Sequence, residues 1–391
     1  MRPGRDRPSL LHTFAPVFFL AAIFFFNFSA RISLGPLMPD VERDLGLGHA
    51  WAGSLFLCIT VGYFISILAS GFVSARLGHR RTIVLSACGV GLVLALVPLT
   101  SAPLGLALGL LGLGLAAGLY LPSGVATLTE LVDQPHWGRA FSIHELAPNL
   151  SFVAAPLVAE ALIDPLGWRG VLAALGGASL LLGLLYAGRG RGSDSPGQPP
   201  SPANLKRVLV QPSFWVLMGL FSLGVGASLG VFTMLPLFLV SEHELARSQA
   251  NLLVAASRVA GVLASFLAGW ASDRLGPRRT LAMVFAASGL LTILMGLSSG
   301  AWLWLAIFLQ PTVAVCFFPA AFAALSRLSQ PASRNLVVSL CVPLGFVVGG
   351  GAFPAAIGWA GQHLGFSWGI AGAGVLILGG LTFLPWLEPG K

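Results

Sequence analysis

The chain has 391 residues, of which 56% are hydrophobic and only 9% are charged, and its formal net charge is +8. Soluble domains carry about 25% charged residues, so this composition excludes a water-facing globular protein and indicates a membrane protein in contact with the lipid bilayer. The positive charge is expected to lie along one membrane face, and no nucleic-acid partner is predicted.

Twelve apolar segments, each close to the ~20 residues that a membrane span requires, follow one another along the chain. The expected helices of the first half cover residues 14–38, 50–74, 81–100, 103–130, 138–162 and 168–187, and those of the second half cover 213–240, 247–271, 280–299, 301–325, 335–361 and 367–387. Residues 189–212 are rich in Gly, Ser and Pro and are expected to form a cytoplasmic linker. The sequence therefore predicts an all-α membrane protein of 12 transmembrane helices in two six-helix bundles, 1–188 and 213–391.

The first span contains Arg31, a charge within an apolar segment. Such a charge costs at least ~2.5–3.5 kcal/mol at the bilayer centre, so it requires a partner or a wet cavity. Asn27 lies one turn earlier on the same helix face. We favour a substrate-binding role for both residues over the alternative that Arg31 extends outward towards Asp40 or Glu42. Tyr120, in the fourth span, is a further candidate for the cavity, although a lone polar group more often bonds a neighbouring helix.

A phrase of glycines and charged residues occurs twice, 198 residues apart, at Gly71, Arg76, Gly78 and Arg80 and again at Gly269, Asp273, Arg274, Gly276 and Arg278. Each copy follows an apolar stretch, where one helix must end, turn tightly and lead into the next. Glycine permits such a turn because it has no Cβ. Two matching copies indicate that the chain consists of two pseudo-symmetric halves.

This phrase resembles the loop between helices 2 and 3 of the major facilitator superfamily (MFS), and its counterpart between helices 8 and 9. The resemblance implies the MFS fold and a gating role for the residues of both loops. It also implies that the acidic position helps to hold the cytoplasmic side closed. The second copy has Asp273 at that position, whereas the first copy has Ala75.

The fifth span contains an unusual polar group, His144 and Glu145, followed by Pro148. Proline removes the helical partner of the His144 carbonyl, and a kinked polar helix is tolerated only where it is buried in protein or lines water. A histidine titrates near neutral pH, so either residue could carry a coupling proton. The alternative is that one of them pairs with Arg139 near the cytoplasmic interface.

The eighth span contains Arg258 near its middle. Asn251, Arg258 and Ser265 are spaced by seven residues and should form one polar stripe on the helix. We favour a place for Arg258 and Asn251 on the substrate pathway over a structural pairing of Arg258 with another helix.

The distribution of Lys and Arg predicts the orientation. With both termini in the cytoplasm, 17 of the 22 basic residues lie on the cytoplasmic side, and only Arg43, Arg169 and Arg247 lie outside. The sequence therefore predicts a multi-pass protein of the cell (inner) membrane with both termini cytoplasmic.

Two arginines and a histidine within the spans predict an anionic substrate, since a guanidinium binds carboxylate or phosphate through paired hydrogen bonds. Arg31 and Arg258 together resemble the organic-anion carriers of the superfamily, although position 254 is Val where the monocarboxylate branch has Asp. The expected function is secondary transport of a small organic anion by alternating access, coupled to protons through His144 or Glu145.

Two alternatives remain open at this stage. One is a drug efflux carrier of the same superfamily, although the fifth span lacks the Gly-Pro-x-x-Gly-Gly ending of the proton-antiport branch. The other is a membrane receptor that senses an anion without moving it. Nucleophile, phosphate-loop and metal-ligand patterns are absent from the sequence, so no enzyme activity, cofactor or metal is expected, and a single chain is expected to be the functional unit.

Overall fold

The computed structural model describes residues 10–192, 206, 208–328 and 334–387, and these residues form helices and short turns without a strand. Within these ranges, eleven helices are long and apolar enough to cross a membrane. One of them, Gln134–Arg189, has 56 residues and is interrupted at Gly167, where the backbone adopts φ 65° and ψ 171°. This segment therefore supplies two spans, and the described residues contain the twelve spans that the sequence predicts.

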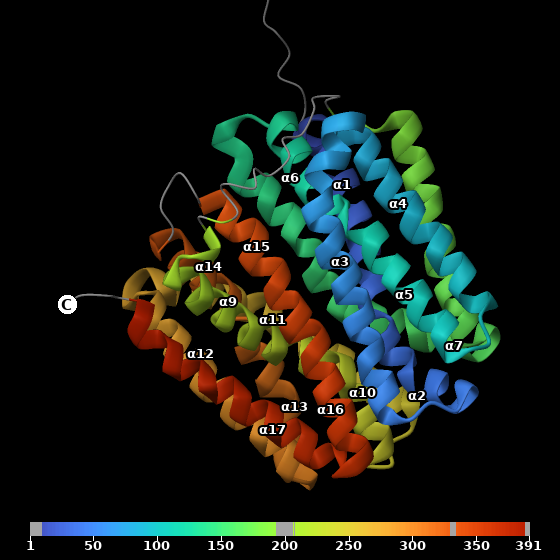
Figure 1. The fold of residues 1–391 in the computed structure, drawn as a ribbon, viewed down its shortest axis with the longest axis vertical. Coiled ribbons are helices and arrows are strands. Elements are labelled where there is room, and N and C mark those ends of the chain that lie inside the picture. The colour runs from blue at the N-terminus through green and yellow to red at the C-terminus, as the bar shows by residue number, and fades with distance from the viewer. Residues whose placement is uncertain (1–9, 193–205, 207, 329–333, 388–391) are drawn as a thin grey trace, which may run out of the picture.

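The first bundle contains all helices up to residue 189 (Figure 1). Its elements are α1 Leu10–Ile32, α2 Leu34–Leu45, α3 His49–Leu77, α4 His79–Leu96, η1 Val97–Leu99, α5 Pro103–Gly118, α6 Tyr120–Leu131, η2 Gln134–His136 and α7 Trp137–Arg189. The predicted first span, 14–38, thus consists of α1 and α2, which meet at a break beside Ser33.

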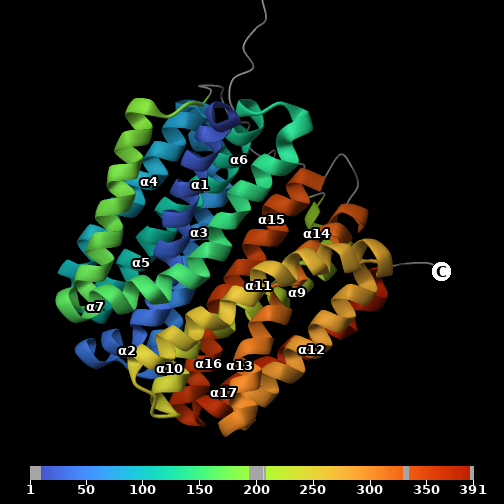
Figure 2. The ribbon, with the colours of Figure 1, turned by 180° about the vertical axis from the view of Figure 1, so that it is seen from behind.

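The second bundle begins at residue 212 and lies beside the first (Figures 1 and 2). Its elements are α9 Pro212–Val225, η3 Gly226–Gly230, α10 Val231–Ser241, α11 Arg247–Leu275, α12 Pro277–Leu297, α13 Gly300–Ala314, α14 Phe317–Leu328, α15 Arg334–Val347, η4 Val348–Ala352, α16 Phe353–His363, α17 Phe366–Leu378 and η5 Gly379–Leu387. Most of the expected linker, 189–212, lies outside the described residues, so the domain boundaries stay a prediction.

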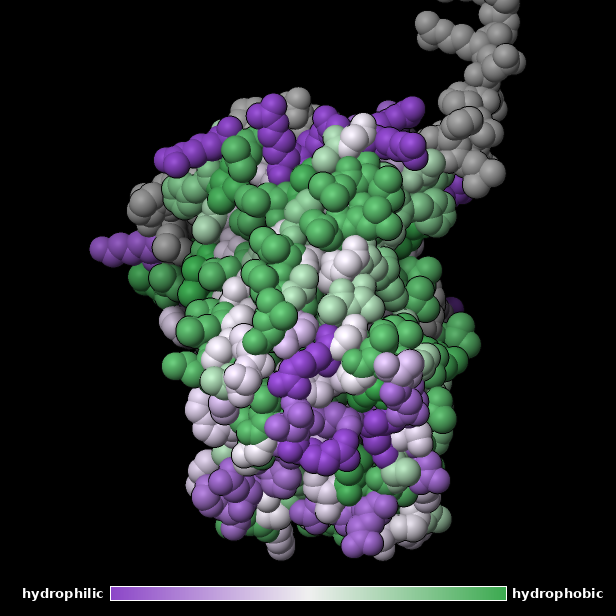
Figure 3. Space-filling model, turned by 90° about the vertical axis from the view of Figure 1, so that its right-hand side faces the viewer, coloured by the Kyte–Doolittle hydropathy of each residue, from purple (hydrophilic) through white to green (hydrophobic). Residues whose placement is uncertain are grey.

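The surface follows the pattern of a membrane protein. Figure 3 shows a broad apolar belt, with hydrophilic side chains at the upper end and over the lower part of this face. At the upper end the two repeated loops lie with Arg76, Arg80, Arg81, Arg274, Arg278 and Arg279, and we call this the basic end. The opposite end, where α2 and α10 lie, contains Asp40, Glu42, Asp44, Glu160, Asp164, Glu242 and Glu244, and we call it the acidic end.

Glycines allow helices of the two bundles to approach at the acidic end. A Cβ on Gly53 of α3 would lie 2.2 Å from the carbonyl oxygen of Pro354 in α16. A Cβ on Gly358 would lie 2.3 Å from the carbonyl oxygen of His49. Because neither position leaves room for a side chain, the backbones of α3 and α16 are in direct contact there.

Two π-helical segments, η3 and η4, pack against each other inside the second bundle. A Cβ on Gly349 of η4 would lie 2.4 Å from the amide nitrogen of Gly226 in η3. Such π-helical turns occur mostly as single turns within α-helices, often at functional sites. The glycine-rich run 349–351 thus packs closely against the seventh span and, at Gly351, against Leu57 and Thr60 of the second span.

Candidate functional site

Four aromatic side chains from four spans meet between the bundles. They are Phe28 of α1, Tyr63 of α3, Phe152 of α7 and Phe232 of α10, and we call them the aromatic layer. Within it, the ring centroids of Phe28 and Phe152 are 5.3 Å apart and those of Phe152 and Phe232 are 4.8 Å apart, both edge-to-face. Phe152 and Phe232 belong to different bundles, so the layer crosses the interface between them.

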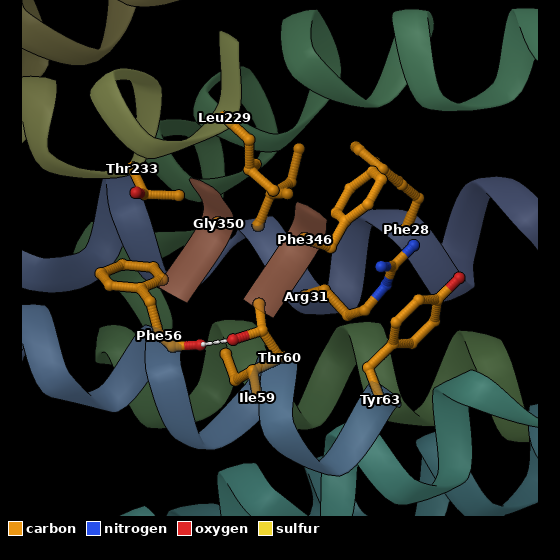
Figure 4. A pocket seen from close by; sticks show the side chains of 11 residues that line it. Phe28, Arg31, Phe56, Ile59, Thr60, Tyr63, Leu229, Thr233, Phe346 and Gly350 are labelled. Carbon is orange, nitrogen blue, oxygen red and sulfur yellow. Dashed lines mark hydrogen bonds between the residues drawn. The ribbon is translucent and has the colours of Figure 1, made fainter. Parts of the chain in front are cut away.

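Arg31 lies on the first-bundle side of this layer and is only 9% exposed. Its guanidinium carbon lies 4.1 Å from the Tyr63 ring centroid and 4.8 Å from that of Phe28. Its Nε is buried without a hydrogen-bond partner among the described residues. Figure 4 shows the guanidinium between these two rings, while Phe346 and Leu229 approach from the second bundle.

A small cavity adjoins Arg31 between the bundles. Its volume is about 20 Å³, which is enough for roughly one water molecule. It is lined by residues of α1, α3, η3, α10, α15 and η4, among them Thr60, Thr233 and Gly350. The cavity is therefore formed jointly by both bundles, with Arg31 as its charged group.

Arg258 lies on the second-bundle side of the layer and is 7% exposed. Its guanidinium carbon lies against the rings of both Phe152 and Phe232, at 4.5 and 4.6 Å from their centroids. One Nη donates a hydrogen bond of 2.6 Å to the carbonyl oxygen of Ser228, and the other lies 3.5 Å from the Ser228 hydroxyl. The π-helical turn η3 thus presents its backbone to the guanidinium.

Neither buried arginine has an acidic partner among the described residues. A cation on a desolvated aromatic face gains about 2 kcal/mol or more, which offsets much of the ~2.5–3.5 kcal/mol that a charge costs at the bilayer centre. The rings supply no negative charge, however. An anion that contacts Arg31 and Arg258 would therefore gain two charge-assisted contacts, one to each bundle.

His144 lies in the core of the first bundle and is 0% exposed. Its ring stacks on Phe24 of α1 at 4.5 Å, and its Nε2 lies 3.0 Å from the Tyr120 hydroxyl. Its Nδ1 lies 3.3 Å from Oε1 of Glu145. The centroid of Phe24 is in turn 6.3 Å from that of Phe28, so His144 connects to the aromatic layer through one ring.

The other predicted binding residues lie away from the cavity near Arg31. The amide of Asn27 donates to the carbonyl oxygen of Ala117 at 3.0 Å and lies 3.4 Å from the Ser86 hydroxyl, so it joins α1 to α4 and α5. The amide of Asn251 donates to the carbonyl oxygen of Pro36 and to Glu160, both at 3.2 Å. Asn251 therefore lies at the acidic end, on a contact between the bundles.

Sequence reasoning missed the role of Arg247, which it counted only as an external charge. Arg247 begins α11 and donates to Glu160 at 3.0 and 3.2 Å and to Asp164 at 2.7 Å, both on α7. It also lies 3.6 Å from Asp40 of α2. One second-bundle side chain thus contacts three carboxylates of the first bundle. The i,i+4 spacing of Glu160 and Asp164 was the available signal, because it places both on one helix face.

The repeated loops form tight turns at the basic end, as expected. Gly78 and Gly276 adopt φ 78° and 84°, a region that favours glycine. A Cβ on Gly269 would meet no atom within 4 Å, and Gly71, its counterpart, is half-buried. Both lie in the last turns of their helices.

Two charged members of these loops contact groups of their own bundle. Arg80 donates to the carbonyl oxygen of Ala187 at 2.7 Å, and Arg274 lies over the Trp270 ring. Arg76, Asp273 and Arg278 are exposed. Over the described part of the chain, no group of three or more His, Cys, Asp or Glu side chains could hold a metal ion.

Comparison with known proteins identifies the family. The sequence model of the Major Facilitator Superfamily matches residues 17–246 and 230–391. The probable nitrate/nitrite transporter NarK2 of Mycobacterium tuberculosis is 25% identical over 348 residues, covering 85% of both chains. The gallate transporter of Pseudomonas putida is 24% identical over 299 residues, covering 67% of this chain and 66% of that protein.

The solved structures agree on the fold. A bacterial homologue of the human lysosomal transporter Spinster, in an inward-facing and unoccupied conformation, has a TM-score of 0.84 at 16% identity, with 98% of each chain covered. The nucleoside transporter NupG has a TM-score of 0.73 at 14% identity, with 96% of this chain and 98% of that chain covered. The chain therefore belongs to the Major Facilitator Superfamily and is a multi-pass membrane transporter rather than an enzyme.

Proposed function

We propose that this protein carries a small organic anion across the cell membrane by alternating access, with a proton coupled to its movement. The observation that supports it is the pair of buried arginines, Arg31 and Arg258, which lie on opposite bundles and face no carboxylate among the described residues. A bound anion would contact both bundles at once and draw them together. A proton on His144 or Glu145 would then change the charge of the first bundle near the aromatic layer.

We assign the basic end to the cytoplasm, because Arg and Lys accumulate on the cytoplasmic side of membrane proteins. Both termini are then cytoplasmic, and the inter-bundle contacts of Arg247 close the external side. In this conformation the anion would enter or leave through the basic end. A single chain contains both bundles and is proposed to act alone.

A planar inorganic oxyanion is a second candidate, since the cavity beside Arg31 holds only about 20 Å³. The similarity to NarK2 favours nitrate or nitrite as probes, and the similarity to the gallate transporter favours an aromatic carboxylate. The experiment therefore uses proteoliposomes and radiolabelled nitrate, acetate, succinate, gallate and glycerol phosphate, at two pH values.

The decisive variants are Arg258→Lys and Arg258→Ala. Lysine keeps the charge but loses the planar fork, so binding of a bidentate anion should fall at least tenfold in both variants. Arg279→Lys, at the exposed basic end, is the matched control and should leave affinity unchanged. Near-normal affinity in Arg258→Lys would refute anion binding by Arg258. The alternative is that Arg258 serves only as the counter-charge of Glu145. In that case the double variant, Arg258→Ala with Glu145→Gln, should restore folding and transport.

A further inference from the structure

The Tyr120 hydroxyl determines which nitrogen of His144 carries a proton. Tyr120 lies 2.7 Å from the carbonyl oxygen of Leu20 and 3.0 Å from Nε2 of His144. A carbonyl oxygen can only accept, so the single hydroxyl proton of Tyr120 must lie on the bond to Leu20. The hydroxyl is then the acceptor for His144, and Nε2 must be the nitrogen that donates.

This arrangement has a consequence for the other ring nitrogen. In a neutral imidazole with a proton on Nε2, Nδ1 is a bare acceptor. Nδ1 lies 3.3 Å from Oε1 of Glu145, which is also an acceptor when ionised. Two facing acceptors repel each other, so the contact requires one additional proton. That proton lies either on Nδ1, as imidazolium with carboxylate, or on Oε1, as imidazole with carboxylic acid.

We infer that Tyr120 is a positioning residue that makes His144 and Glu145 bind one shared proton in this conformation. The inference rests on the proposed function, since it specifies where the coupling proton is held. Removal of that proton leaves the two acceptors facing each other, so Glu145 must then swing away from His144. Proton release is thereby tied to a movement of Glu145.

The same geometry gives the proton a route. Glu145 is 58% exposed, whereas His144 is 0% exposed. Glu145 lies seven residues before Phe152 and shares its helix face, which is the face that meets Arg258 of the second bundle. The proton therefore reaches His144 through Glu145, from the space between the bundles.

No other charged side chain among the described residues lies within hydrogen-bond or ion-pair distance of His144. From α1 the ring faces Phe24, which is uncharged. The remaining titratable groups on the helices packed against α7 are Arg31 of α1, Asp40, Glu42, Arg43 and Asp44 of α2, His79, Arg80, Arg81 and Cys88 of α4, Glu130 of α6, His136 of η2, and Arg247, Arg258, Asp273 and Arg274 of α11. The shared proton thus depends on Tyr120, His144 and Glu145.

The test is Tyr120→Phe, measured on purified protein without an anion. The loss of the hydroxyl frees His144 to carry its proton on Nδ1 and donate to an ionised Glu145. The pair then no longer requires the additional proton, so the proton uptake curve should shift, with about one proton fewer bound at a given pH than in the natural protein. Nitrogen-15 NMR of histidine-labelled protein should show protonated Nε2 in the natural protein and protonated Nδ1 in the variant, with the signal assigned through His144→Gln.

Tyr186→Phe is the matched control, since Tyr186 is equally buried but its hydroxyl donates to the carbonyl oxygen of Arg191. It should leave the proton uptake curve and the His144 signal unchanged. Should Tyr120→Phe fail to fold, Glu145→Gln replaces it. The glutamine amide can donate to bare Nδ1, so His144 should stay neutral with protonated Nε2 in the nitrogen-15 spectrum.

An unshifted uptake curve in Tyr120→Phe, or a neutral Nδ1-protonated His144 in the natural protein, would overturn the inference. Both readouts are independent of anion transport. Loss of anion transport with an intact proton shift would leave this inference standing and overturn the proposed substrate site only.

Discussion

The two ends of the molecule differ in how their charges are paired. At the acidic end Arg247 contacts Glu160, Asp164 and Asp40 across the interface, and the backbone amide of Ala50 donates to Gln362 at 3.0 Å. At the basic end Arg80 donates to a carbonyl oxygen of its own bundle, Arg274 lies over Trp270 of its own helix, and Asp273 is exposed.

This difference indicates which contacts hold the present conformation. Arg247, Asn251 and Gln362 make their polar contacts between the bundles at the acidic end, whereas the repeated phrase lies at the basic end. We infer that Asp273 acts mainly in the opposite conformation, where the basic end is closed. Rocking of the bundles would then exchange one set of contacts for the other.

The largest effect is expected for Arg247→Ala. Its loss leaves Glu160 partly buried without a cation and leaves Asp40 with Arg43 alone, which should cost the present conformation about 2 kcal/mol and shift the conformer ratio roughly thirtyfold. Spin labels at positions 166 and 297, both exposed in the apolar belt towards the acidic end, would report a longer distance between the bundles. The labels require a background in which Cys58, Cys88, Cys316 and Cys341 are replaced.

Asp164→Asn is the matched control for this prediction. Asp164 is 78% exposed, and an exposed ion pair contributes only about 0–1 kcal/mol. The label distances should change little in Asp164→Asn. Equal shifts in the two variants would contradict the proposal that the buried part of this network holds the acidic end closed.

A smaller effect is expected for Asp273→Asn at the basic end. Asp273 is exposed and has no ion-pair partner in the described part of the chain, so the present conformation should keep its stability. If Asp273 stabilises the closed basic end, its removal should slow transport about tenfold, the equivalent of one charge-assisted hydrogen bond. Initial transport rates and anion-dependent melting temperatures would separate turnover from binding.

The first copy of the phrase provides the counterpart to this test. Ala75→Asp would add the acidic group that the first loop lacks, and it should slow turnover if it overstabilises one conformation. Unchanged transport in Asp273→Asn would remove that residue from the mechanism.

The smallest effect is expected from glycines of the second loop. Gly276→Ala should lower the melting temperature by a few degrees, because φ 84° is strained for any other residue. Gly269→Ala should be neutral or slightly stabilising, since the added Cβ would meet no atom within 4 Å in a helical position. Thermal unfolding in detergent measures the melting temperatures of both variants. Equal destabilisation by the two substitutions would show that the positive φ of Gly276 is not what requires glycine at that position.

The sequence predicted the twelve spans and the two turns because lipid contact forces long apolar helices and because Gly78 and Gly276 lie at matching positions. It also selected Arg31, Arg258 and His144, since charged or titratable groups within apolar spans are rare. The sequence did not single out Phe24, which is buried against His144.

The aromatic layer could not be predicted, because 26 phenylalanines give no pattern that separates the interface from the lipid face. The contacts of Arg247 join residues 83 and 87 positions apart, and the spacing of Glu160 and Asp164 indicated only that these two carboxylates share a helix face. The outward course considered for Arg31 is not observed. Asp40 lies against Arg43 and Arg247, and Glu42 bonds His49 at 2.9 Å, while Arg31 stays among aromatic rings. Tertiary packing decides such pairings.

One continuous helix, the part of α7 before Gly167, connects the proposed proton site to both buried charge contacts between the bundles. Its helical part before Gly167 carries Glu145, Phe152 and Glu160 at spacings of seven and eight residues, near one face and spread over roughly 22 Å. A tilt of this helix would therefore move three groups together: Glu145 with His144, the Phe152 ring that contacts Arg258, and Glu160, the partner of Arg247. A single fluorescent label on the exposed side of this helix, at Leu150, would then change its signal when a proton binds, when an anion binds and when the acidic end opens.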